Sequence, residues 1–201
     1  MENRMLFNLD TLVKKYNIHI DGVIHVGGHI GEEIPLYKKY TNNIHVFEPQ
    51  KDCFDKIENS VQKYCVALGS KKEVKTFFVA NNNQSSSLLE PKEHLNQHPE
   101  VLFNKTVEIQ VETLDSFNIK NCSFMNLDVQ GYELEVLKGS NNTLEQINHI
   151  YTEINTKYLY KDCVLLDELD AWLDQKGFIR VELSMCMHFD WGDALYIRKN
   201  K

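Results

Sequence analysis

Three glycines and one glutamate near the start of the chain have the types and the spacing of a nucleoside-binding site. Gly27, Gly28 and Gly31 follow one apolar segment, and Glu48 follows the next. In a strand–turn–helix–strand unit, a carboxylate about twenty residues after the glycines is placed to bond a ribose diol. Glycines alone would also suit a tight turn without a ligand. With Glu48, the pattern predicts that an adenosine-containing ligand binds here.

The spacing of these glycines also indicates which ligand. A dinucleotide turn requires G-x-G-x-x-G, and its first glycine position is held here by Val26. Glu32 and Glu33 fall in the opening turn of the helix predicted next, where the helix field attracts anions and two carboxylates would repel a pyrophosphate. We therefore expect S-adenosyl-L-methionine, which has an adenosine, no phosphate and a positive centre, rather than a nicotinamide dinucleotide.

Asp128 is a second candidate site residue, because it ends the apolar strand predicted at 122–129. An acid in that position is costly to bury unless it binds a cation or accepts good hydrogen bonds. Two interpretations stay open. Asp128 faces the positive end of the cofactor or the substrate, or it caps the helix that follows.

If a hydroxyl accepts a group from such a cofactor, it must lose its proton, and a general base would then be expected. The candidates are Asp128, Glu153 and His188. Glu153 lies near the end of the strand predicted at 147–154, and a histidine titrates near neutral pH. Asp193 is interpreted as a turn residue ahead of the last strand.

A metal site is not predicted. Asp128, Glu153 and Asp193 could in principle offer oxygen ligands to Mg²⁺. Zinc is rejected, because i, i+4 histidine pairs bind metal mainly on a helix with a third ligand. His25 and His29 form one such pair, which spans a predicted strand and a turn. His94 and His98 form the other, which lies near two prolines.

The composition narrows the class of protein. With 201 residues, 42% hydrophobic and 25% charged, the chain fits one domain over residues 1–201, with 1–20 as an N-terminal helical extension. A net charge of −7 and no dense basic run disfavour nucleic acid as a partner. Five cysteines without a C-x-x-C pair are expected to be free buried thiols. No signal-like start or membrane-length run is found, so a cytoplasmic location is expected.

Strand-like and helix-like segments alternate, which predicts a parallel α/β sheet with helices on both faces. The last two strands, joined by a loop alone, predict an antiparallel hairpin at its edge. A polar stretch at 81–99 is predicted to be a long loop, which often carries function. The predicted helices are 7–16, 31–40, 51–59, one starting at 131, and 165–176. The predicted strands are 23–26, 44–47, 64–68, 74–79, 107–111, 122–129, 147–154, 178–183 and 194–198.

Taken together, these segments resemble the FkbM family of S-adenosylmethionine-dependent methyltransferases over roughly residues 20–198. The resemblance implies a Rossmann-like class I methyltransferase fold, a seven-stranded, mostly parallel sheet with an antiparallel last strand. It also implies O-methylation of a hydroxyl on a sugar, a glycan or a small natural product. The segments that carry it, with 127–139 the most specific, are 23–31, 46–49, 66–69, 85–88, 113–115, 127–139 and 151–153.

The resemblance also assigns cofactor contacts. It implies that the loop 27–31 packs against the methionine part of the cofactor and that Glu48, next to Pro49, bonds the ribose. Val66 and Ala67 would border the adenine.

One position departs from the family pattern. Many members carry an acid where this chain has His25, and Asp128 is a hypothetical replacement for it. A neutral His25 bonded inside the sheet is the simpler interpretation. Two other functions stay open: a cofactor-binding module without activity, and an NAD-dependent oxidoreductase. The oligomeric state is not predicted.

Selection of the acceptor is expected from two stretches, 81–99 and 156–160. In the second stretch Tyr158 and Tyr160 could stack on a sugar ring or simply cover the core.

Overall fold

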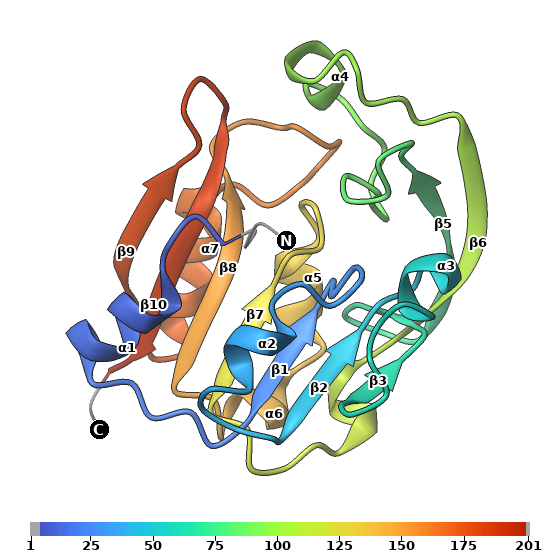
Figure 1. The fold of residues 1–201 in the computed structure, drawn as a ribbon. Helices are drawn as coiled ribbons and strands as arrows, with labels where there is room; N and C mark the ends of the chain where they lie inside the picture. The colour runs from blue at the N-terminus through green and yellow to red at the C-terminus, as the bar shows by residue number, and fades with distance from the viewer. Residues whose placement is uncertain (1–4, 200–201) are drawn as a thin grey trace.

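The computed structural model describes residues 5–199 and shows a seven-stranded sheet with helices on both faces (Figure 1). Strand β10 is antiparallel to both of its neighbours, and all other neighbours in this sheet are parallel. The predicted fold class is therefore confirmed. In spatial order the strands are β3 (Gln62–Tyr64), β2 (Ile44–Phe47), β1 (Val23–Val26), β7 (Phe124–Leu127), β8 (His149–Asn155), β10 (Trp191–Arg198) and β9 (Phe178–Met185).

The central strands are buried on both faces, as expected for parallel strands between helix layers. Successive residues face opposite sides, so Ile24 and Val23 belong to different apolar cores. Helices α1 (Leu9–Tyr16) and α2 (Ile34–Tyr37) pack on one face. The other face is covered by α5 (Glu133–Lys138), α6 (Asn141–Leu144) and α7 (Leu166–Gln175). The N-terminal helix is thus packed against the sheet.

Two predicted helices are much shorter than expected. The helix predicted at 31–40 is only the four residues of α2, and the one predicted at 51–59 is α3 (Lys51–Phe54). Gly31 has a φ of 85°, which lies outside the helical region, and Glu33 is the N-cap of α2. Glu32 and Glu33 therefore precede the first turn of α2, and the prediction that both lie within that turn was wrong.

The segment predicted as one strand at 64–68 is divided between two sheets. Its start belongs to β3, and after residues 65–66 the chain enters a second, three-stranded sheet that the sequence did not predict. The strands of this sheet are, in spatial order, β4 (Ala67–Leu68), β6 (Lys105–Glu112) and β5 (Glu73–Val79). Between β5 and β6 lies the long predicted loop, with helix α4 (His94–Gln97), and a 3₁₀ turn, η1 (Leu114–Phe117), follows β6.

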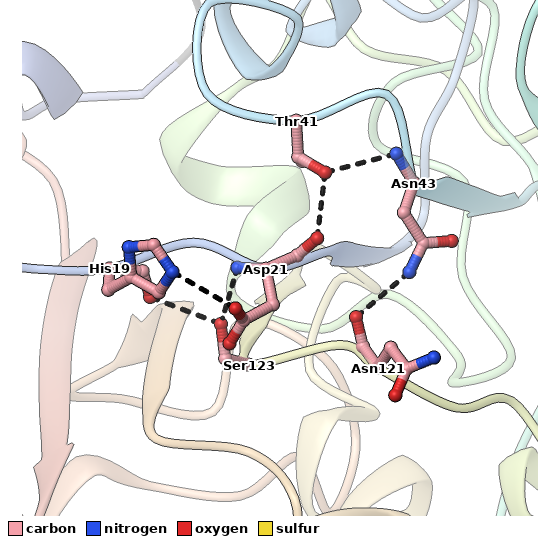
Figure 2. A network of polar contacts seen from close by, with 6 residues as sticks. All are labelled: His19, Asp21, Thr41, Asn43, Asn121 and Ser123. Atoms are coloured by element: carbon pink, nitrogen blue, oxygen red, sulfur yellow. Dashed lines mark hydrogen bonds and ion pairs between the residues drawn. The ribbon is translucent and has the colours of Figure 1, made fainter.

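A polar network closes the sheet at the amino ends of β1, β2 and β7 (Figure 2). The Ser123 hydroxyl accepts from the Asp21 N–H at 2.9 Å and donates to the His19 carbonyl at 3.1 Å. The Asn43 side chain donates to the Asn121 carbonyl at 2.9 Å. These contacts fix the loops that enter the strands. They lie at the edge opposite to the one where ligands bind in open α/β sheets.

No helix within residues 5–199 has the length and apolar character needed to cross a membrane. Over the same residues, no group of three or more histidine, cysteine, aspartate or glutamate side chains is arranged to hold a metal ion. All five cysteines are free, but Cys65 is exposed and Cys186 is half-buried, so the expectation of buried thiols holds for only three.

Candidate active site

Two adjoining hollows lie at the carboxyl ends of the central strands, where the topology of an open sheet leads one to expect a ligand. The first has a volume of about 540 Å³ and lies over the ends of β1 and β2. The second has a volume of about 1070 Å³ and lies over β7, β8 and β10. Asp128 and Gln84 line both, so the two hollows share a wall.

Glu48 is the acidic group of the first hollow and is only 3% exposed. Its Oε2 accepts the His29 N–H at 2.9 Å and its Oε1 accepts the Gln50 N–H at 2.7 Å. A carboxylate has about four lone-pair positions, so each oxygen can accept one more bond. That capacity matches a pair of ribose hydroxyls.

The charge of Glu48 is finely balanced. Burial raises the pKa of its carboxyl to about 7, while the two backbone N–H bonds act in the opposite direction and the charge of Asp128 adds to the rise. The group therefore changes its charge near neutral pH.

The rest of the first hollow is mostly apolar. Pro49, Val66 and Ala67, which the resemblance assigned to the cofactor, all line it. An apolar slot that leads to one carboxylate fits an adenosine, whose flat base and ribose diol need those two environments. The apolar residues that complete the walls are Val26, Phe47, Leu68, Phe77, Leu88 and Val129.

Of the three predicted glycines, Gly27 lines the first hollow, whereas Gly28 and Gly31 shape the loop behind it. Gly27 has a φ of 84°, and a Cβ on it would lie 1.8 Å from the backbone oxygen of Asp128. No other residue fits there without moving the β7 end. The glycine loop and Asp128 are therefore in direct backbone contact.

Replacing Gly27 with alanine should lower the free energy of unfolding more than the same change at Gly177. Both have a positive φ, which costs a side chain about 1–2 kcal/mol, but a Cβ on Gly177 would have 3.8 Å to its nearest neighbour. Denaturant unfolding of the two variants measures the difference. Equal losses would mean that the contact between Gly27 and Asp128 does not restrict the loop.

Gln130 joins the two predicted carboxylates. Its Nε2 donates to Asp128 Oδ1 and to Glu153 Oε2, each at 2.8 Å. Its Oε1 faces the Tyr160 hydroxyl at 2.9 Å, and its backbone oxygen accepts from Ser87 at 2.8 Å. Because both amide hydrogens are used, the amide fixes the two acids relative to each other. The sequence signal was its place in the segment 127–139, but no role was assigned to it.

Asp128 does not cap a helix. Its backbone N–H donates to Val26, its carboxylate accepts from Gln130, and α5 begins only at Glu133. The capping interpretation of Asp128 was therefore wrong.

Asp193 was also misplaced by the sequence, since β10 starts at Trp191 and Asp193 lies within it, paired with Glu153 of β8. It is 5% exposed and accepts from the Tyr151 hydroxyl and, at 2.7 Å, from the Leu6 N–H. Burial and the Asp193 charge raise the pKa of Tyr151, which keeps its hydroxyl protonated as the donor. The N-terminal segment thus closes one side of the second hollow, which Met5 also lines.

The stretch 81–99 forms the opposite wall of the second hollow, through residues that include Asn82, Ser85 and His94. Its backbone bonds the stretch 156–160, for example from His94 N to Leu159 O at 3.0 Å. Trp191 and Tyr151 are among the residues that line the hollow, whereas Tyr158 and Tyr160 are not. Tyr160 is fully buried and bonded to Gln130, and Tyr158 is 41% exposed under Lys92.

The predicted histidines differ in their positions. His188 lies in the exposed turn between β9 and β10 and lines neither hollow, so the structure does not bring it to Asp128 and Glu153. His25 is 2% exposed and edge-on to Tyr37, with ring centres 5.7 Å apart, and it lines the second hollow. His25 is therefore a buried residue of the sheet that also borders the second hollow.

Comparison with known proteins identifies the family. The model of the methyltransferase FkbM domain matches residues 25–180. The chain belongs to the FkbM methyltransferase family. Solved structures of the same fold include the magnesium protoporphyrin IX methyltransferase from Synechocystis PCC 6803 with bound S-adenosylmethionine, at a TM-score of 0.55 and 10% identity over 95% of this chain and 76% of that one.

Two curated relatives of this FkbM protein act as methyltransferases. The 2-O-methyltransferase NoeI of Sinorhizobium fredii is 31% identical over 81 residues, which cover 38% of this chain and 33% of NoeI. The hexuronic acid methyltransferase AglP of Haloferax volcanii is 27% identical over 142 residues, 70% of this chain and 59% of AglP. The chain thus spans less than two thirds of either relative.

Among solved structures, the methyltransferase FkbM from Methylobacillus flagellatus KT is similar to this chain with a TM-score of 0.57. The identity is 14%, and the match covers 88% of this chain and 43% of that one. At that identity the likeness concerns the fold.

Proposed function

We propose that this protein transfers the methyl group of S-adenosylmethionine to a hydroxyl oxygen of a sugar or glycan. The observation that carries the proposal is the shared wall of the two hollows, formed by Asp128 and Gln84. A cofactor in the first hollow would have its reactive end near Asp128, facing an acceptor in the second. The name of AglP, a relative that acts on a hexuronic acid, supports a sugar as the acceptor class.

The residues present fit the cofactor. Glu48 would bond the ribose, Val66 and Ala67 would border the adenine, and Gly27 would allow the methionine part to approach the backbone. When bound, the cofactor supplies a methyl group activated by its sulfonium. The chain mainly has to orient the acceptor oxygen along the line of the S–CH₃ bond, and such positioning can supply several kcal/mol of the rate enhancement.

Asp128 and Glu153 are the candidates for taking the proton of the acceptor hydroxyl. Both line the second hollow, and Gln130 holds both in one geometry. A positioned carboxylate that removes the proton as the oxygen attacks contributes about 10²–10⁴-fold in general acid–base catalysis. Asp128 is the better candidate, because it alone of the two also lines the first hollow.

Calorimetric titration with S-adenosylhomocysteine, with NAD as the comparison ligand, tests the cofactor part of this proposal. We expect binding of S-adenosylhomocysteine and none of NAD. If NAD bound and S-adenosylhomocysteine did not, the first hollow would belong to a dinucleotide site. If neither bound, the glycine loop and Glu48 would be scaffold in this chain, or the site would form only with an acceptor present. A second titration, with acceptor glycosides added to the protein in the calorimeter, distinguishes a scaffold from a site that forms only with an acceptor.

A further inference from the structure

His94 is an unusual member of the wall of the second hollow, because its environment is aromatic and its side chain is polar. It lies on α4 and is 4% exposed. The centre of its ring is 5.3 Å from that of Tyr160, 5.4 Å from that of Phe103 and 4.9 Å from that of His98. These contacts fix the plane of the imidazole without using its nitrogens.

The buried Nδ1 atom of His94 has no hydrogen-bond partner among residues 5–199. Burial, and then the neighbouring His98, lower the pKa of His94 to about 4, so the ring is neutral at neutral pH. A neutral imidazole has one donor and one acceptor nitrogen. Buried polar atoms are nearly always bonded, and an exception at a hollow indicates that a partner is supplied from outside the chain.

Asn155 is a second such residue, and it lies on β8 beside Trp191 of the hollow. It is completely buried, and neither its Oδ1 nor its Nδ2 has a partner in the described part of the chain. It lies on the same face of β8 as Glu153 and pairs in register with Trp191 of β10. Trp191 lines the hollow and packs, as Phe103 does, on the cluster Leu159, Tyr160 and Cys163. Two unsatisfied polar side chains thus border one aromatic wall.

We propose that His94 and Trp191 form the subsite that holds the acceptor ring, with the ring lying against Trp191 and one of its hydroxyls hydrogen-bonded to His94. Asn155 offers a further bond behind Trp191. An aromatic face with polar atoms at its border suits a saturated ring that carries several hydroxyls, as in a pyranoside. This inference rests on the proposed function and adds the residues that select the ring.

The test variant is His94→Phe, which keeps a ring among Tyr160, Phe103 and His98 and removes both nitrogens. His149→Phe is the matched control, because the Nδ1 of His149 is also buried without a partner but lies at the amino end of β8, away from both hollows. Both variants should unfold at a temperature no lower than that of the parent protein, since each loses an unsatisfied polar atom. A clear loss for His94→Phe alone would indicate a structural role and overturn the subsite.

The functional measurement is transfer of tritium from methyl-tritiated S-adenosylmethionine to four probes, namely the methyl pyranosides of glucose, galactose and rhamnose, and glucuronic acid. For a probe that the parent protein methylates, His94→Phe should raise the KM of the sugar about tenfold, which corresponds to one hydrogen bond. The KM of the cofactor should not change, and His149→Phe should behave as the parent does. His94→Asn, which places an amide near the lost Nδ1, should recover part of the loss.

The outcomes separate this inference from the proposed function. Transfer to a probe with the same KM for the sugar in His94→Phe and in the parent would overturn the subsite and leave sugar methylation standing. Binding of S-adenosylhomocysteine without transfer to any of the four probes would overturn the proposed acceptor class and the subsite with it.

Discussion

Replacing Asp128 with asparagine should lower kcat by about 100-fold or more while leaving the fold intact. The loss has the size expected for a carboxylate that takes a proton in the transition state. The fold should persist because asparagine has the same shape and its Oδ1 can still accept the bond from Gln130 Nε2, now 2.8 Å from Asp128. Steady-state kinetics with an accepted glycoside, together with the unfolding temperature, give both quantities.

Glu153→Gln is the matched control for Asp128→Asn. Glu153 is bonded to the same Gln130 amide at the same distance but lines only the second hollow. If Asp128 is the base, the control should lose less turnover and show its effect mainly in the KM of the acceptor. A larger loss of kcat in Glu153→Gln would exchange the two roles. Normal turnover in Asp128→Asn would remove that residue from the reaction.

The features that the sequence predicted well are those set by local spacing. The glycines and Glu48 lie about twenty residues apart in one strand–turn–strand unit, so their meeting depends on elements that are adjacent in the chain. The same holds for the first helix, which was predicted at 7–16 and which Asn8 caps by accepting the Thr11 N–H at 3.0 Å. The number of strands in the main sheet followed from the family resemblance rather than from the residues.

The features that the sequence missed depend on contacts between distant segments. The second sheet pairs Ala67 with Val111, and no sequence pattern near either residue predicts that pairing. Asp193 was assigned to a turn because it follows Asp190 and Gly192, yet pairing with β8 extends the strand past it. His94 was considered only as a zinc ligand, since its aromatic neighbour Tyr160 is far away in the chain.

The predicted length of α2 was wrong for a local reason that helix propensity does not describe. The stretch ahead of α2 contains His29 and Gly31, both with positive φ, and the helix then ends after one turn at Tyr37. A histidine in the left-handed region is not expected from its type alone. Its side chain pairs with Glu32 at 2.9 Å, and its N–H bonds Glu48. These two contacts, and not the helix propensity of the residues, hold the loop in this conformation.

Changes at Glu48 should alter the affinity for the cofactor and its dependence on pH. Glu48→Ala should weaken binding of S-adenosylhomocysteine by about 1–3 kcal/mol, because buried bonds to the ribose are lost. In the protein as it is, only the ionised carboxylate can accept from two hydroxyls. With a pKa of about 7 in the free protein, roughly a tenth of the molecules are ionised at pH 6. The affinity should therefore rise about tenfold between pH 6 and pH 8.

The sign for stability is opposite to that for binding. The pKa of Glu48 in the folded protein lies above its ordinary value of 4.5, so folding favours the protonated form. Its contribution to the free energy of unfolding is fully present below pH 4.5 and is lost as the pH rises through about 7. Glu48→Gln, which is neutral and of the same shape, should remove both pH dependences. Calorimetric titration of Glu48→Gln with S-adenosylhomocysteine at pH 6 and pH 8 tests this prediction. If the affinity of that variant still rose tenfold, the titrating group would be another residue. The proposed bond between Glu48 and the ribose would then lose its support.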